Sequence, residues 1–98
     1  MKVAFVGTIT CYRQIDVKGV PAGQIDVLQV GDHKRPTKTV TINVYDQSYC
    51  RIILETLQEV KLPIMRAIMW IVADKSEILC DLLQLVSINE SLLLEGES

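Results

Sequence analysis

The residues best suited to catalysis or metal binding are few and far apart in this chain. The only histidine is His33, and the three cysteines are Cys11, Cys50 and Cys80. Nucleophilic catalysis needs a base beside the nucleophile, and a zinc site needs ligands at characteristic spacing such as Cys-x-x-Cys. Neither pattern occurs, so we predict no catalytic residue, no metal site and no cofactor. We interpret the cysteines as reduced thiols among apolar neighbours.

Basic groups, by contrast, gather in the first half of the chain. The net charge is −2, yet residues 1–45 carry six basic and three acidic groups, whereas residues 46–98 carry four basic and nine acidic groups. The basic residues of the first half are Lys2, Arg13, Lys18, Lys34, Arg35 and Lys38. This split predicts a polarised surface, with its positive side on the first half of the fold.

Single-strand nucleic-acid binding needs a positive groove for the backbone and aromatic faces for the bases. Basic residues fall in the two predicted hairpin loops, and two tyrosines alternate with the apolar residues of their strands, so each ring is expected to point away from the core. The predicted nucleic-acid-binding residues are Tyr12, Arg13, Lys18, Lys34, Arg35, Lys38 and Tyr45. In the alternative interpretation, Lys34, Arg35 and Lys38 form a solvated basic loop without a ligand, and the two tyrosines pack on strands or on a partner.

Hydrophobic periodicity predicts the elements that position these residues. Alternating apolar and polar residues indicate strands at residues 3–12, 24–30 and 39–45. Apolar residues at helical spacing then indicate an amphipathic helix at residues 47–61, capped by Asp46 or Ser48 and ended by Pro63.

Two more strands are predicted at residues 65–73 and 77–88, although a helix beginning at Ser76 competes for the last segment. Five strands with one helix between the third and the fourth is the order of a mostly-β, five-stranded Greek-key barrel, the oligonucleotide/oligosaccharide-binding fold. If residues 77–88 were helical, this barrel would not close.

The opening residues, Lys2-Val-Ala-Phe-Val-Gly-Thr-Ile9, resemble the first strand of bacterial and phage single-stranded DNA-binding proteins. Residues 18–28 are similar to the glycine-containing hairpin of that family, and the predicted helix falls at the matching place. The resemblance implies the same barrel, binding of single-stranded DNA or RNA, a role in replication, recombination or a mobile element, and assembly into dimers or tetramers.

An apolar fraction of 49% exceeds what one small core needs, which also suggests self-association. We predict an oligomer interface at Met65, Met69 and Trp70, in an almost uninterrupted apolar strand. The function predicted from these features is non-catalytic binding of single-stranded nucleic acid. The alternative is a homo-oligomeric protein–protein interaction module that binds no nucleic acid.

The chain is expected to form one domain at residues 1–88, followed by a short acidic tail at residues 89–98. No apolar run approaches the roughly 20 residues needed to cross a bilayer. The N-terminus lacks the long apolar region of a secretory signal. We therefore expect a cytoplasmic protein that does not associate with membranes.

Overall fold

The computed structural model describes residues 1–31, 33–74 and 77–89, with some side chains near residues 75–76 and at residue 89 left aside. In this part of the chain the elements are β1 (Lys2–Val17), β2 (Val20–Gln29), β3 (Lys38–Val44), α1 (Gln47–Glu59), β4 (Ile64–Asp74) and β5 (Glu77–Asn89). Their order is the predicted one. The last segment is a strand, so the helix that competed for it is excluded.

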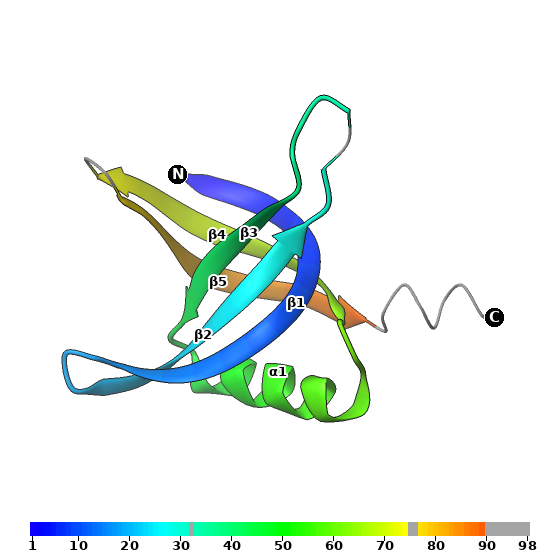
Figure 1. The fold of residues 1–98 in the computed structure, drawn as a ribbon. Coiled ribbons are helices and arrows are strands. Elements are labelled where there is room, and N and C mark those ends of the chain that lie inside the picture. The colour runs from blue at the N-terminus through cyan, green and yellow to red at the C-terminus, as the bar shows by residue number, and fades with distance from the viewer. Residues whose placement is uncertain (32, 75–76, 90–98) are drawn as a thin grey trace.

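The strands form a closed barrel in the order β1-β2-β3-β5-β4 (Figure 1). Every neighbouring pair is antiparallel except β3 with β5, which is parallel and pairs only at Asn43 and Asp81. The predicted Greek-key barrel with one helix between β3 and β4 is therefore confirmed. Its weakest seam is the single β3–β5 pairing.

The barrel interior is filled by the inward-facing residue of each alternating pair. The fully buried large side chains are Ile9, Ile25, Val27, Ile42, Val44, Ile53, Pro63 and Met65. β3 illustrates the pattern: Ile42 and Val44 are buried, Val40 is half-buried, and Thr39 and Thr41 on either side of Val40 are exposed. A period of two places alternate residues on opposite faces of a strand, which is why the sequence of β3 predicted its orientation correctly.

Met65 and Met69 belong to this core, with only 0% and 4% of their surface exposed. The prediction that they form an oligomer interface is therefore wrong, because both point into the barrel of their own chain. Trp70, between inward-facing neighbours, points outward and is 40% exposed. The apolar run of β4 is continuous because its inward face is core and its outward face is also largely apolar.

Helix α1 closes one end of the barrel. Asp46 is its N-cap, and its carboxylate accepts hydrogen bonds from the backbone N–H groups of Ser48 and Tyr49. Cys50 and Ile53 are the buried residues of the helix and belong to the core of the barrel, below which α1 lies in Figure 1. The helix ends at Glu59, two residues earlier than predicted, because Val60 is already extended.

Strands β1 and β2 are longer than predicted and form a protruding hairpin. They pair from Thr8 with Leu28 out to Val17 with Val20, and a bulge at Thr10 interrupts the ladder between Ile9 and Cys11. The turn at Lys18 and Gly19 has positive φ at both residues, 52° and 83°. Such a two-residue turn matches the twist of the flanking strands, so the polar residues beyond the bulge continue as strand rather than loop.

Gly7 marks the closest approach of two walls of the barrel. A Cβ atom there would overlap Val27 Cγ1 and would lie 3.1 Å from Phe5 Cε1. Only a residue without a side chain lets β1 pass this close to β2 at this position.

The tail predicted over residues 89–98 falls, apart from Asn89, outside the described residues; Asn89 itself ends β5. Within the described ranges, no helix combines the length and the apolar character that crossing a membrane requires.

Candidate nucleic-acid interface

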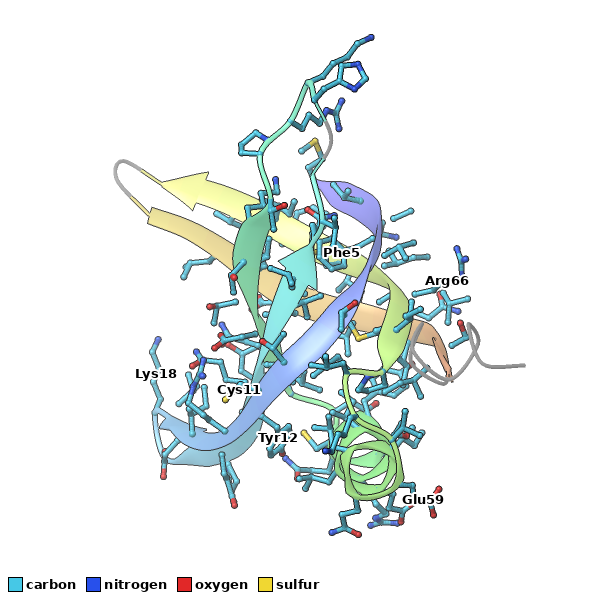
Figure 2. All side chains as sticks on the ribbon, turned by 45° about the vertical axis from the view of Figure 1, so that its right-hand side comes forward. Phe5, Cys11, Tyr12, Lys18, Glu59 and Arg66 are labelled. Carbon is cyan, nitrogen blue, oxygen red and sulfur yellow. The ribbon has the colours of Figure 1, made fainter. Side chains whose placement is uncertain are left out.

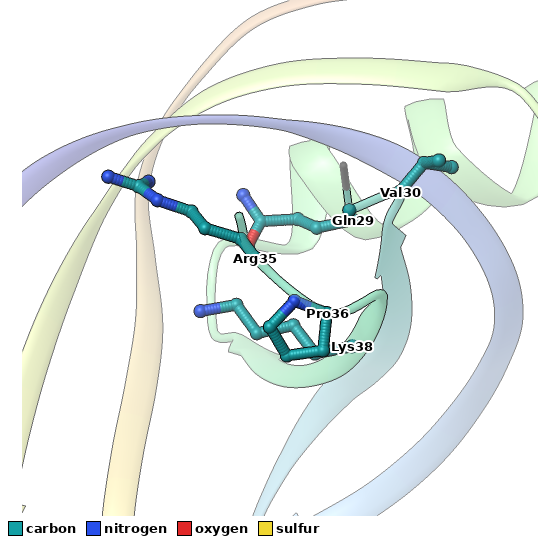
Figure 3. Close-up of a pocket in the computed structure, with 6 residues that line it drawn as sticks. Gln29, Val30, Arg35, Pro36 and Lys38 are labelled. Atoms are coloured by element: carbon teal, nitrogen blue, oxygen red, sulfur yellow. The ribbon is translucent and has the colours of Figure 1, made fainter. Parts of the chain in front are cut away.

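The basic loop lies at the end of the barrel opposite α1. The described residues between β2 and β3, 30–31 and 33–37, rise away from the body (Figure 1) and carry Lys34 and Arg35. The base of the loop encloses a cavity of about 300 Å³, lined by Gln29, Val30, Gly31, Arg35, Pro36 and Lys38. Figure 3 shows the side chains of Arg35, Gln29 and Lys38 extending toward the same side, whereas Val30 points away. His33 and Lys34 are exposed farther along the loop.

A second cavity, of about 440 Å³, opens beside the first and shares Gln29 and Lys38 with it. Its other lining residues are Phe5, Thr39, Val40, Thr41, Met69, Ile71 and Cys80. Five of these are apolar, come from β1, β3, β4 and β5, and face the barrel interior. We call this second cavity the barrel mouth, because no described element covers the barrel there as α1 covers the other end.

The strand register explains why Lys38 lies at the barrel mouth. Lys38 pairs with Gln29, and both continue the inward-facing series of their strands, two residues beyond Val40 and Val27. Polar residues therefore occupy the last inward positions, where the wall of the barrel ends. The Lys38 charge is close enough to Cys80 to favour its thiolate, although burial and the charge of Asp81 outweigh it and raise the pKa of this thiol.

Sequence reasoning missed the barrel mouth, because its walls had the pattern of ordinary core residues. The sequence did contain one signal. Gln29 and Lys38 are polar, although they stand at positions where the alternation of β2 and β3 predicts apolar, inward-facing residues. The structure brings Lys34, Arg35 and Lys38 together in and beside one loop. The remaining predicted residues lie elsewhere.

Arg13 is held in an ion pair on the outer face of the barrel. Its Nη1 and Nη2 donate to the two carboxylate oxygens of Asp26 at 2.8 Å each, and its Nε and Nη2 donate to Gln24 Oε1 at 3.1 and 3.0 Å. Thr41 Oγ1 donates to the same carboxylate at 3.0 Å. These donors hold the pKa of Asp26 below its usual value, with the Arg13 hydrogen bond as the largest cause. The positive charge predicted for Arg13 is thus balanced within the fold.

The same network continues across the outer face to β5. Gln24 Nε2 donates to Asn43 Oδ1 at 3.1 Å, and Asn43 Nδ2 donates to Asp81 Oδ1 at 3.3 Å. Hydrogen-bonded side chains therefore cross four strands, β1, β2, β3 and β5, and they include two carboxylates. In the described structure this stretch of the outer face is a hydrogen-bonded polar surface, and at its β5 end Asp81 pairs with the outward-facing Trp70 of β4.

Tyr12 points toward the core, contrary to the prediction. The bulge between Ile9 and Cys11 shifts the alternation of β1 by one residue, so Tyr12 pairs with the inward-facing Ile25. Its ring packs against the core above α1, as Figure 2 shows. Burial, together with the neighbouring thiol of Cys50, raises the pKa of Tyr12 to about 12. The ring is therefore partly buried against the core instead of standing on the outer face, where it was expected to stack on a base.

Tyr45 and Lys18 lie far from the basic loop. Tyr45 is 43% exposed, as predicted, but it follows β3 at the α1 end, seven residues from Lys38. At about 3.3 Å per residue this separation is about 23 Å. Lys18 is exposed at the tip of the β1–β2 hairpin, on the left of Figure 2.

Solved structures with the same fold are single-stranded DNA-binding proteins. The chain is similar to the mitochondrial single-stranded DNA-binding protein Rim1 of S. cerevisiae, with a TM-score of 0.72 at 12% identity, covering 93% of this chain and 96% of that one. It is also similar to a small single-stranded DNA-binding protein of Streptomyces coelicolor, with a TM-score of 0.55 at 14% identity, covering 96% of each chain. No protein-family model and no curated protein matches the sequence. The resemblance seen in the first strand and hairpin is thus confirmed at the level of the fold.

Proposed function

We propose that this protein binds single-stranded nucleic acid without chemical conversion, and that the basic loop contacts the phosphates. The observation that carries the proposal is the grouping of Arg35 and Lys38 around one cavity at the open end of the barrel, with Lys34 in the same loop. Three cations on a short loop suit a chain of phosphates, because each contact releases condensed counterions. The fold shared with single-stranded DNA-binding proteins supports the same assignment.

The proposed phosphate-contacting residues are Lys34, Arg35 and Lys38. Tyr12 is left out because its ring is turned inward, and Arg13 is secondary because Asp26 already balances its charge. Lys18 and Tyr45 would contact only the more distant parts of a longer strand. Single-stranded DNA is the proposed ligand, with RNA as a second possibility, and a role in replication, recombination or a mobile element rests on the resemblance alone.

The direct test is a titration of the protein with a fluorescein-labelled oligothymidine at low salt. We expect saturable binding that weakens steeply as salt rises. Replacing Lys34, Arg35 and Lys38 together by glutamine should abolish most of this binding without unfolding the barrel. No binding by the unmodified protein at low salt would refute the proposal.

The alternative, a homo-oligomeric interaction module, is favoured by the outer face of β1, β4 and β5. Apolar side chains exposed by 40–49% gather there: Val6, Trp70, Val72, Leu79 and Leu83. We propose that this face joins copies of the chain into a dimer or tetramer, which is compatible with nucleic-acid binding. Light scattering after gel filtration should show an oligomer, and Trp70→Lys should shift it toward the monomer.

A cytoplasmic location also belongs to the proposal. The three cysteines are all free thiols, and Cys11 is exposed. Exposed free thiols suit a reducing compartment better than an oxidising one.

A further inference from the structure

Binding of a single strand needs a place for bases as well as for phosphates. The outer face of β1, β2 and β3 supplies little of this kind, because its described centre is the polar network from Arg13 to Asp81. A base laid on that face would meet side chains already hydrogen-bonded to one another. The barrel mouth instead offers apolar side chains beside the basic loop, and it shares Lys38 and Gln29 with the cavity at the base of the loop.

We propose that the barrel mouth accepts an unstacked base of single-stranded DNA while Lys38 and Arg35 contact the adjoining phosphate. This inference rests on the proposed function and adds to it the place where a base is held. The two adjoining cavities indicate what this site binds. The cavity at the base of the loop is lined by cationic side chains, and the barrel mouth is lined by Phe5 and aliphatic side chains. A nucleotide has the same division between an anionic phosphate and a flat, largely apolar base.

The size and lining of the barrel mouth fit this occupant. Its volume of about 440 Å³ lies in the range of small-molecule sites, about 300–1,000 Å³. Val40 and Ile71 provide half-buried aliphatic walls, and Phe5, Met69 and Cys80, each 4% exposed, also line the cavity. Thr39, Thr41 and Gln29 at the rim carry donors and acceptors that can bind the edge of a base.

The position of Lys38 supports the link between phosphate and base. Its side chain lines both cavities, so an anion that it holds lies next to the apolar walls. It also lies near Cys80, which lines the barrel mouth from the neighbouring strand β5. One cation thus lies between the loop and the interior, where a nucleotide would place its phosphate.

The first experiment fills the barrel mouth. Ile71→Trp places a large ring in the cavity, and Ile52→Trp places the same ring on the exposed side of α1, at the other end of the barrel. Affinity for a fluorescein-labelled oligothymidine is measured by anisotropy, with thermal unfolding of each variant as the check on folding. We expect about tenfold weaker binding for Ile71→Trp, within the effect of one base contact, and little change for Ile52→Trp. Equal affinities for the two folded variants would overturn the proposal.

The second experiment probes the barrel mouth without adding a large side chain to it. Val40→Cys introduces a thiol into the half-buried wall of the barrel mouth, and Cys11 provides an exposed thiol on the outer face beside Arg13. Alkylation rates at the two sites are measured by mass spectrometry for the free protein, with oligothymidine, and with an abasic oligomer of the same length. We expect oligothymidine to slow alkylation at position 40 several-fold while Cys11 is unchanged, and the abasic oligomer to have little effect at either site.

The other outcomes are informative as well. Protection of Cys11 with position 40 unchanged would overturn the proposal and place the strand on the outer face. Equal protection of position 40 by both oligomers would also overturn it, because the backbone alone would then explain the effect. Absence of oligothymidine binding by the unmodified protein would refute the proposed function itself, so the two failures are distinguishable.

Discussion

The two ends of the barrel are built from the same strands, but one end is closed by a helix and the other is open. At one end, α1 inserts Cys50 and Ile53, which are only 5% and 0% exposed, and closes the core. At the other end, Val40 and Ile71 remain half-buried around a cavity of about 440 Å³. The inward series of β2 and β3 there ends in Gln29 and Lys38, which bring polar groups to the rim. The same alternation of inward- and outward-facing residues thus forms a closed core where α1 covers the barrel, and a candidate site at the end that no described element covers.

The largest effect is expected from truncating the side chain with which α1 closes its end of the barrel. Ile53→Ala should destabilise the protein by about 2–5 kcal/mol, because it leaves a cavity in a fully packed site. Ile71→Ala at the barrel mouth should cost about 1 kcal/mol or less, since its side chain already borders open space. Urea unfolding measures both, and equal costs would show that the two ends are packed alike.

Packing below the barrel mouth can be tested at Gly7. Gly7→Ala should cost about 1–3 kcal/mol, because the new methyl group would overlap Val27 and crowd Phe5. Gly19→Asn, in the hairpin turn, is the control: no atom lies within 4 Å of a Cβ there, and asparagine tolerates its φ of 83°. A neutral Gly7→Ala, seen by the same unfolding measurement, would mean that the open cavity extends deeper into the barrel.

The proposed phosphate contact predicts a change in salt dependence. Lys38→Gln should weaken oligothymidine binding several-fold and lower the slope of log affinity against log salt by about 0.7, the value for one lost contact on a single strand. Lys18→Gln, at the hairpin tip, is the matched control and should leave the slope unchanged for a short oligomer. The reverse result would move the binding surface from the barrel mouth to the hairpin.

The smallest expected effect concerns pH and the outer face. The pKa of Asp26 is lowered in the folded state, so its contribution to stability is present above its unfolded pKa of about 4 and is lost as pH falls through the folded value. Asp26→Asn should therefore reduce stability slightly at neutral pH and should flatten the loss of stability in acid. Asp16→Asn, at the far end of the hairpin, is the control. Identical acid profiles for the unmodified protein and Asp26→Asn would exclude a stabilising role for this ion pair.

Much of the fold was predictable from local patterns. Alternation in β3 and the start of α1 depend on near neighbours and were predicted correctly, with Asp46 as one of two predicted caps; the end of α1, assigned to Pro63, lies earlier, at Glu59. The basic loop was predictable too, because Lys34, Arg35 and Lys38 are close in sequence and therefore close in space. The site was predicted only in this part, and the remaining predicted residues are spread over both ends and the outer face.

Two wrong predictions share a physical cause. Tyr12 turned inward because a single inserted residue reverses which face of a strand every later side chain occupies. Met65 and Met69 lie in the core and not in an interface. The sequence pattern of an apolar strand is the same whether the strand packs inside its own barrel or against another chain. In both cases the deciding information lies in a neighbouring strand, not in the segment itself.

The sequence by itself determined the order of the elements, the cap of α1, the orientation of β3 and the gathering of positive charge in one loop, because short-range periodicity and composition control these features. The tertiary structure alone decided that Asp26 balances Arg13, that Tyr12 faces the core, and that Lys38 lies above an open apolar cavity. These features depend on strand register and barrel closure, which join residues far apart in the chain. Long-range pairing of this kind leaves no periodic signal in any one segment.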